Sequence, residues 1–316
     1  MTLTDDHRSR PSVVLVGGAG GLGSTVAFTL LRTSTPYDIV IVDTRAEMIT
    51  SHVMDLTDAL SLGGAHSVRG GVLADAFDAD IVVVSASVPL RLNTSRDVFL
   101  QENAALLASI VDPLAASGWH GVFILMTNPV DPLLTWIQAR TGWDRTKVLG
   151  YSLNDTQRFR TGVALALNVE ARTVGCAVVG EHGQGQVLVW SSVTVDGVPR
   201  DLTEAERAVV RDYVDNWYVR HVALDSGRTS TWSSGLGGAL MVEAVITGST
   251  APFPVSFVLD GEYGVHGVSS SSPALLGPDG IRESLPVTLS PQELADLSET
   301  AHKIAALAET LPASPA

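Results

Sequence analysis

A polar stretch at residues 87–97, SVPLRLNTSRD, carries two arginines five positions apart, Arg91 and Arg96. The protein is otherwise acidic, because 34 aspartates and glutamates outnumber 20 lysines and arginines and leave a formal net charge of −14. In such a field, an anionic substrate must be drawn in by a few placed arginines. The stretch therefore predicts a loop that holds an anion.

Two further stretches contain groups able to do acid–base or anion-binding chemistry. VGEHGQG (179–185) places His182 between glycines at the end of an expected strand. NDTQRFR (154–160) places Asp155 and Arg158 three residues apart, on one face if the segment is helical. Each has an ordinary interpretation when taken alone, as a structural histidine and as a surface ion pair. Only their combination with other features points to a site.

The segment VVLVGGAGGLGSTVAFTLL combines an apolar strand, a glycine turn and a helix-forming run. Two glycine spacings overlap in the turn, because Gly18-Gly20-Gly23 fits G-x-G-x-x-G and Gly17-Gly20-Gly23 fits a looser form. Glycines so placed allow a tight turn and let backbone N–H groups approach a pyrophosphate at the positive end of a helix. A glycine cluster alone is weak evidence, since such turns also serve packing.

Asp43 strengthens the case for a dinucleotide. It ends the second expected strand, 20 residues after Gly23. A carboxylate at this place would accept hydrogen bonds from the adenosine ribose hydroxyls and would repel a 2′-phosphate. The pattern predicts NAD rather than NADP as the cofactor, although Arg45 is a nearby positive charge that weakens the preference.

The elements that must position these residues follow from the apolar patterning. Four apolar runs lack polar alternation, which is typical of strands buried on both faces of a parallel sheet: residues 13–17, 39–43, 80–86 and 122–126. Mixed segments between them predict helical crossovers, and hence a Rossmann-type doubly wound α/β fold over residues 1–150, with 1–11 as a flexible tail. Residues 151–316 indicate an α+β substrate domain, with strands at 172–180 and 186–199.

Two capping boxes predict the starts of two helices in the second half. Thr203 with Glu206 three residues later predicts a helix over EAERAVVRDYVDNWYVRHV. Ser290 with Glu293, and a proline at the first helical position, predicts another through ELADLSETAHKIAALAETL.

Charge and cysteine content narrow the partners and the compartment. The negative field repels nucleic acid and anionic membranes, so neither is expected as a partner. The N-terminus has no apolar signal region, and no uninterrupted apolar run approaches the ~18 residues of a membrane span. Cys176 is the single cysteine, which fits a reducing compartment. We expect a cytoplasmic protein.

Taken together and in this order, the stretches resemble the lactate/malate dehydrogenase family over nearly the whole chain. The resemblance rests on the glycine turn, Asp43, the 88–103 loop and the D-x-x-R pair, and on four motifs: VMDL at 53–56, TNPVD at 127–131, GEHG at 180–183 and STWSSGLGGAL at 230–240. It implies an NAD-dependent enzyme that transfers a hydride reversibly between the cofactor and a small anionic 2-hydroxy or 2-oxo acid.

The resemblance also implies a role for each site residue. His182 would be the general acid/base, and Asp155 would bind its other ring nitrogen and favour the imidazolium. Arg158 would grip the C1 carboxylate with its two-pronged guanidinium. Arg96 would polarise the substrate carbonyl once its loop closes. Two residues would line the site, one beside the nicotinamide and one in the substrate pocket: Asn128 and Ser230.

The residues that would read the substrate side chain depart from the family pattern. Counting back six from Arg96 reaches Leu90, where malate-type enzymes usually have arginine and lactate-type enzymes glutamine. A malate-type substrate would need the adjacent Arg91 for its distal carboxylate, whereas an apolar or unusual 2-oxo acid needs only Leu90. The turn GGAGGLG is malate-like, so both substrates remain open. Asn154 looks like an inserted residue before Asp155, which predicts a rebuilt turn.

Two other classes of protein are compatible with an NAD-binding fold. An NAD-dependent glycosidase would need a metal held by cysteine and histidine, but Cys176 lacks that setting, so no metal is expected. A redox-inactive NAD-binding protein would be favoured by loss of any of four residues that are all present: His182, Asp155, Arg158 and Arg96. The resemblance further suggests a homo-oligomer, either a dimer or a tetramer.

Overall fold

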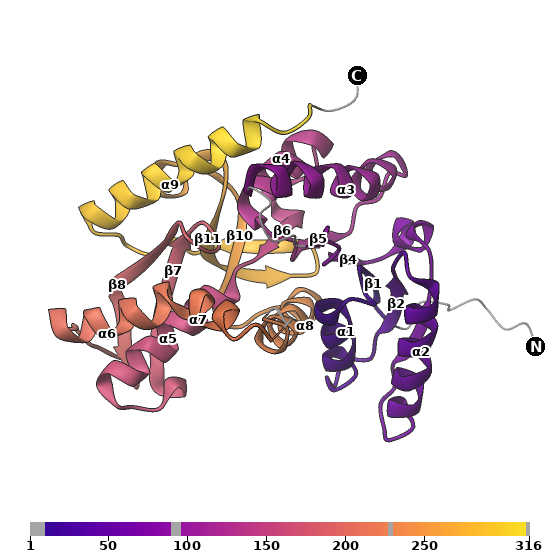
Figure 1. The fold of residues 1–316 in the computed structure, drawn as a ribbon, viewed down its shortest axis with the longest axis horizontal. Helices are drawn as coiled ribbons and strands as arrows, with labels where there is room; N and C mark the ends of the chain where they lie inside the picture. The colour runs from indigo at the N-terminus through magenta and orange to yellow at the C-terminus, as the bar shows by residue number, and fades with distance from the viewer. Residues whose placement is uncertain (1–9, 90–95, 227–229, 314–316) are drawn as a thin grey trace, which may run out of the picture.

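A computed structural model describes residues 10–89, 96–226 and 230–313, without the side chains of Arg96 and Asp97. Within these residues the strands form one mixed sheet (Figure 1). Its first half is parallel, in the order β3-β2-β1-β4-β5-β6: β1 Ser12–Val16, β2 Asp38–Val42, β3 Ser67–Gly70, β4 Ile81–Val84, β5 Val122–Leu125 and β6 Val148–Tyr151. The order reverses between β1 and β4, which is where doubly wound sheets bind ligands.

The parallel strands are covered on both faces, as their uninterrupted apolar runs predict. Val13 and Leu15 of β1 belong to one hydrophobic cluster, whereas Val14 and Val16 belong to another. Four helices follow the strands as crossovers: α1 Gly21–Leu30, α2 Ala46–Leu60, α3 Arg96–Ala116 and α4 Val130–Thr141. The Rossmann-type fold expected from the sequence is confirmed.

Helix α3 is the one helix among the described residues that is long and apolar enough to cross a membrane, with a mean hydropathy of 1.2 over Val98–Ala116. Its apolar character has a simpler cause, because one face of the helix is packed in the core. The buried side chains on that face recur at helical spacing: Leu100, Ala104, Leu107, Val111 and Leu114.

The second half continues the same sheet with antiparallel strands. β10 (Phe253–Asp260) pairs with β6, and β11 (His266–Gly277) joins it to β7 (Val174–Gly180). The remaining strands are β8 Gln186–Val195, β9 Val198–Pro199 and β12 Gly280–Ser284. The helices are α5 Leu153–Leu167, α6 Glu204–Asp215, α7 Trp217–Ala223, α8 Trp232–Thr247 and α9 Pro291–Glu309, and short 3-10 turns lie at Leu73–Asp78, Arg145–Lys147, Ala171–Thr173 and Glu262–Gly264.

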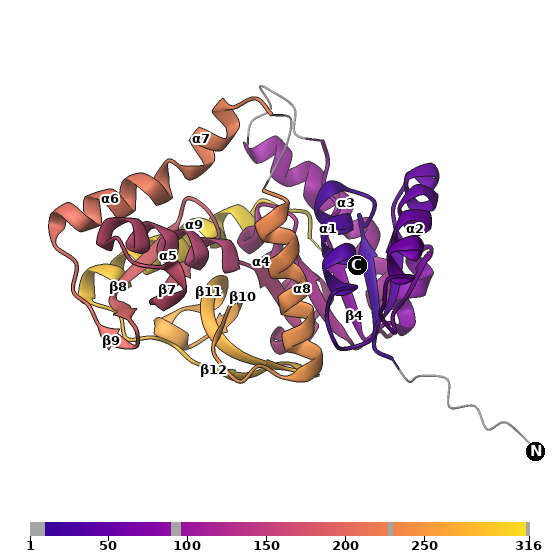
Figure 2. The ribbon, with the colours of Figure 1, turned by 90° about the horizontal axis from the view of Figure 1, so that it is seen from below.

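Both predicted capping boxes are present at the starts of α6 and α9. The helix predicted to run on after Thr203 is nevertheless wrong in one respect, because it is divided in two at Asn216. The backbone of Asn216 leaves the helical region (φ −95°, ψ 0°), and its side-chain amide donates to Asp212 Oδ1 at 2.9 Å. Helix α7 therefore continues beyond α6 with a bend (Figure 2).

Candidate active site

The glycine turn lies at the carboxyl end of β1, against the end of β4. Gly17 has a positive φ of 80°, and a Cβ there would come within 2.5 Å of the Ala86 backbone nitrogen. A Cβ on Gly23 would come within 2.6 Å of the Gly17 carbonyl oxygen. Helix α1 begins directly after Gly20, so its free N–H groups face the space above the turn. Only glycine fits this cradle, and it has the chemistry that a pyrophosphate requires.

Asp43 follows β2 and faces the glycine turn. Its Oδ2 accepts a hydrogen bond from Ala19 N–H at 3.2 Å, and Arg45 binds both carboxylate oxygens, with Nε–Oδ1 at 3.0 Å. Burial opposes ionisation, but the hydrogen bonds and charge of Arg45 outweigh it and hold the pKa of Asp43 below its usual value. The carboxylate is thus ionised and oriented where an adenosine ribose is expected, with Arg45 beside it.

His182 and Asp155 form a close pair. Nδ1 of His182 lies 2.6 Å from Oδ2 of Asp155, and the Asp155 side chain is almost wholly buried. Burial alone would lower the pKa of His182, but the charge and hydrogen bond of Asp155 outweigh it, and the pKa is raised above the ordinary value. Because an ionised carboxylate can only accept, Nδ1 carries a proton and Nε2 is the nitrogen left for a ligand.

The backbone of His182 is held by a residue that sequence reasoning missed. Its N–H donates to Oδ2 of Asp131 at 2.6 Å, and Oδ1 of the same carboxylate accepts from Ser269 Oγ at 2.8 Å. Asp131 is fully buried in the first turn of α4, and burial raises its pKa. The only sequence signal for this role was a carboxylate, the last residue of TNPVD, at the start of an otherwise apolar helix.

Arg158 lies one helical turn after Asp155 on α5, and its Nη1 is 3.8 Å from Asp155 Oδ1. The predicted sharing of one helix face is confirmed. The guanidinium lies over the indole of Trp217, with 4.1 Å between its central carbon and the ring centroid. Burial lowers the pKa of Arg158, since a desolvated cation is disfavoured. A buried guanidinium beside the His182–Asp155 pair is suited to hold an anion next to the acid/base group.

Asn128 is exposed at the end of β5, and its position is fixed through the buried Asn103 of α3. The Asn103 amide donates to the Asn128 carbonyl at 2.9 Å, while its Oδ1 accepts from Val88 N–H at 2.9 Å. A single side chain thus ties the segment after β4 to the segment after β5. Asn103 is a second positioning residue that the sequence pattern did not single out.

Asn154, which the sequence suggested as an inserted residue, is buried in the first turn of α5 and contacts α8. It accepts a hydrogen bond from Tyr151 Oη at 2.9 Å and donates to Ser234 Oγ at 2.7 Å. The Tyr151 ring in turn packs edge-on to His182, with centroids 6.5 Å apart. Ser230 precedes α8 and shares a hydrogen bond of 3.0 Å with Ser233. The start of α8 is therefore attached to the first turn of α5, which carries Asp155.

Three predicted site residues are described only in part or not at all. Leu90 and Arg91 lie outside the described residues. Arg96 is the first residue of α3, but its side chain is outside the description. The roles predicted for these residues stay predictions.

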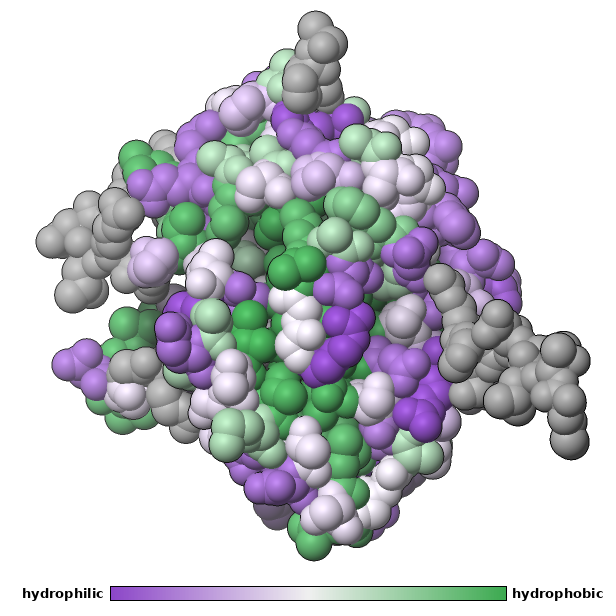
Figure 3. Space-filling model, turned by 90° about the vertical axis from the view of Figure 1, so that its right-hand side faces the viewer, coloured by the Kyte–Doolittle hydropathy of each residue, from purple (hydrophilic) through white to green (hydrophobic). Residues whose placement is uncertain are grey.

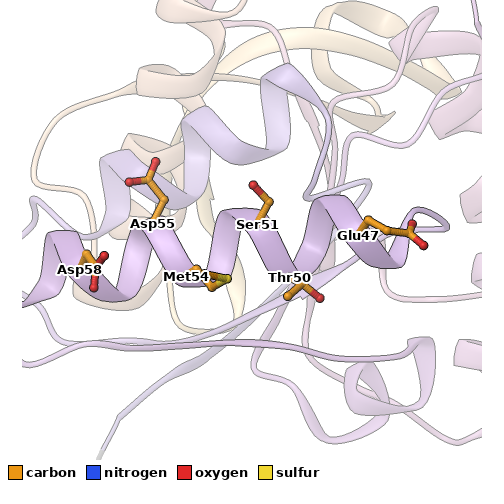
Figure 4. Close-up of a pocket in the computed structure, with 6 residues that line it drawn as sticks. All are labelled: Glu47, Thr50, Ser51, Met54, Asp55 and Asp58. Carbon is orange, nitrogen blue, oxygen red and sulfur yellow. The ribbon is translucent and has the colours of Figure 1, made fainter.

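A shallow groove elsewhere contains none of the site residues. It follows the outer face of α2, where six side chains project from one helix (Figure 4): Glu47, Thr50, Ser51, Met54, Asp55 and Asp58. Its carboxylates would repel an anionic substrate. The candidate active site is instead the part of the molecule that contains the His182–Asp155 pair, Arg158 and the glycine turn.

Comparison with known proteins agrees with this geometry. The NAD-binding domain model of lactate/malate dehydrogenases matches residues 12–150, and the α/β C-terminal domain model of the same family matches residues 153–311. L-lactate dehydrogenase 2 of Lactiplantibacillus plantarum is 31% identical over 303 residues, which cover 95% of this chain and 97% of that protein. L-lactate dehydrogenase 2 of Lactococcus lactis subsp. lactis is 30% identical, covering 94% and 98%.

Solved structures give the same result. The minor L-lactate dehydrogenase of Enterococcus mundtii superposes with a TM-score of 0.88 at 29% identity, covering 96% of this chain and 99% of that one. The malate dehydrogenase of Aeropyrum pernix superposes with a TM-score of 0.87 at 27% identity, covering 95% and 98%. The glycine cradle fits the NAD that the family uses. The chain belongs to the lactate/malate dehydrogenase family, and its cofactor is NAD.

Proposed function

We propose that the protein catalyses the reversible reduction of a small 2-oxo acid to the 2-hydroxy acid, with His182 as acid/base and Arg158 as the carboxylate ligand. The observation that carries the proposal is the joint placement of these two groups on one carboxylate, since Asp155 lies 2.6 Å from His182 and 3.8 Å from Arg158. An acid/base group beside a buried cation is what a 2-oxo acid needs, because its reacting carbonyl is bonded directly to its carboxylate.

Proton transfer is assigned to Nε2 of His182. When bound, NADH supplies the hydride that reaches the substrate carbonyl carbon. During reduction, His182 donates a proton to the carbonyl oxygen. During oxidation of the 2-hydroxy acid, it accepts the proton of the hydroxyl group. Asp155 stabilises the imidazolium before transfer and fixes the ring orientation throughout. Asp131 holds the histidine's backbone, so that ring and main chain are positioned by separate carboxylates.

Arg158 orients the substrate. Its planar N–H edge matches both oxygens of a carboxylate, and burial excludes competing water. We assign to Arg96 the stabilisation of charge that develops on the carbonyl oxygen. Asn128 lines the nicotinamide side of the site and Ser230 the substrate side. Arg96 begins α3, and Asn103 on the same helix holds the Asn128 backbone. Helix α3 therefore connects Arg96 to the backbone of Asn128, which supports a shared position for these two residues at the site.

For the substrate side chain we favour an apolar 2-oxo acid over oxaloacetate. Leu90 stands at the position that reads the side chain in the family, and the two relatives compared above by sequence carry the name L-lactate dehydrogenase. One of the two solved structures compared is a malate dehydrogenase. The malate-like glycine turn and Arg91 support oxaloacetate as the second candidate. NADH oxidation against a panel of 2-oxo acids separates the two. A native preference for oxaloacetate that falls with Arg91→Ala would reverse our choice, whereas Leu90→Arg should shift an apolar preference toward oxaloacetate.

We also propose that the protein is a homo-oligomer assembled through α1, α2 and α8. Phe28, Leu236 and Leu240 are about half exposed and Met54 is two-thirds exposed. Helices α1 and α8 touch closely, since a Cβ on Gly235 would lie 2.3 Å from Thr25 Cγ2. A band of apolar surface runs down the face viewed in Figure 3, on the side of α2. A second copy of the chain would cover it.

A further inference from the structure

The Arg158 guanidinium is stacked in a set of three planar groups. Trp217, the first residue of α7, lies beneath it at 4.1 Å. The imidazole of His221, one turn further along α7, lies parallel to the same indole, with centroids 5.1 Å apart and 10° between the planes. The arginine comes from α5 and the two aromatic rings from α7. The stack therefore joins a residue of the proposed substrate site to a separate helix.

The two aromatic residues of the stack are also the least exposed residues of α7. Trp217 and His221 are the two partly buried residues of α7, and its other five residues are exposed. Arg220 fastens the helix to α6, donating to Asp212 Oδ2 at 3.2 Å and to the Tyr213 carbonyl at 2.9 Å. Since no α7 side chain is fully buried, the orientation of Trp217 depends on its ring contacts.

Among the described residues, few other contacts hold the Arg158 side chain. Within the part of the chain that the structure describes, its guanidinium makes no hydrogen bond, and the oxygen of its ion pair with Asp155 is 3.8 Å away. The side chain is only 18% exposed, so water cannot fully replace the missing partners. An indole on the flat face leaves the N–H edge free for an anion while shielding the cation from solvent.

We propose that Trp217 is a positioning residue for substrate binding. By stacking on Arg158 it fixes the orientation of the guanidinium plane, and it excludes water from one face of the place where Arg158 binds the substrate carboxylate. The inference rests on the proposed function of Arg158. Its consequence is that the affinity for any 2-oxo acid depends on an aromatic ring at position 217, whatever the substrate's side chain. The chemical step is not affected, because Trp217 acts through Arg158 and not on the reacting carbonyl.

The test is a set of substitutions at Trp217 in the full-length protein. A cation–π contact with a desolvated cation corresponds to roughly a 3- to 30-fold effect on binding. Trp217→Ala and Trp217→Leu should raise KM for the 2-oxo acid by about that factor, with kcat and the Kd for NADH nearly unchanged. Trp217→Phe, which keeps a ring, should restore most of the affinity. Leucine keeps apolar volume without a ring, so it separates stacking from space filling.

Two controls separate positioning from folding. Tyr218→Ala alters the exposed neighbour on the same helix and should leave KM unchanged. In an Arg158→Lys background, Trp217→Ala should raise KM less than it does alone, because the stacked plane is already lost. If the wild type turns over a 2-oxo acid and Trp217→Ala has the same KM, the role of Trp217 is overturned while the proposed function stands. A wild type that reduces no 2-oxo acid would overturn the proposed function and this inference with it. A drop in kcat equal to the rise in KM would show a merely structural role.

Discussion

Asp155 and His182 are 27 residues apart in the chain, yet Oδ2 of one lies 2.6 Å from Nδ1 of the other. The pair forms where the first turn of α5 meets the end of β7. Oδ1 of Asp155 makes no hydrogen bond in the described structure and is directed toward Arg158 instead. One buried carboxylate therefore contacts both the proposed proton-transfer group and the proposed anion-binding group, and substitutions at Asp155 should affect both.

The pH dependence of turnover should report this pair. Reduction needs the imidazolium, so kcat/KM for the 2-oxo acid falls as pH rises through the raised pKa of His182. In Asp155→Asn the larger of the two charges that raise this pKa is gone, while the charge of Asp131 remains and burial still lowers the pKa, so the fall should occur at lower pH. The measurement is the pH profile of NADH-dependent reduction for both proteins. An inflection that stays in place or moves to higher pH would show that Asp155 does not control His182.

Asp131→Asn should damage catalysis without loss of cofactor binding. The change removes the charge that receives the His182 N–H at 2.6 Å, and charge-assisted hydrogen bonds contribute about 1.5–3 kcal/mol. If all of this free energy serves to orient His182 for proton transfer, its loss lowers kcat on the order of 10- to 100-fold. Ser269→Ala is the matched control, because it removes one donor and leaves the carboxylate in place. It should have the smaller effect. A normal kcat in Asp131→Asn would remove the positioning role.

Cofactor choice should depend on Asp43 and Arg45 together. In Asp43→Ala, the repulsion of a 2′-phosphate is lost and Arg45 is released from its two hydrogen bonds. Binding of NADPH should therefore improve relative to NADH, as measured by fluorescence titration. The double variant Asp43→Ala/Arg45→Ala should lose most of that gain, because no cation remains to receive the phosphate. Tighter binding of NADPH than NADH by the unchanged protein would contradict the ribose assignment.

The oligomer proposal predicts a change in mass after one substitution. Leu240→Asp places a charge in the apolar α1–α8 surface and should shift the protein to a smaller species in light scattering coupled to gel filtration. Val198→Asp is the control, since Val198 is as exposed as Met54 but lies on β9. It should leave the mass unchanged. A monomeric wild type would refute the assembly, and an unchanged mass in Leu240→Asp would place the interface elsewhere.

The sequence predicted β1, β2, β4 and β5 and the cofactor turn because their causes are local. It did not predict β3 or β6, which are four-residue strands that contain glycine, nor β10, β11 and β12. Apolar runs such as that of β4 and the glycines after β1 follow from burial and from close backbone approach, both of which depend on neighbouring residues. The capping box at Thr203 was predictable for the same reason. The break at Asn216 was not, because the residues on either side of it have ordinary helical composition.

The contacts that support the site could not be predicted from the sequence, because they join segments that are far apart in the chain. Asp131 meets His182 across 51 positions, and Asn103 reaches Asn128 across 25. The stack of Trp217 on Arg158 likewise depends on how α7 is placed after the bend. No short motif reports such contacts, whereas the acid/base pair itself could be inferred from family-like spacing.

The most direct test of the account is NADH-dependent reduction of a panel of 2-oxo acids by the wild type and by His182→Ala, with the NADH Kd measured for both. The account predicts turnover of at least one 2-oxo acid by the wild type. It predicts a loss of roughly 10²- to 10⁴-fold in the variant, with the Kd nearly unchanged because the glycine cradle is untouched. A wild type that reduces none of the acids, or a His182→Ala variant with a near-normal rate, would contradict it.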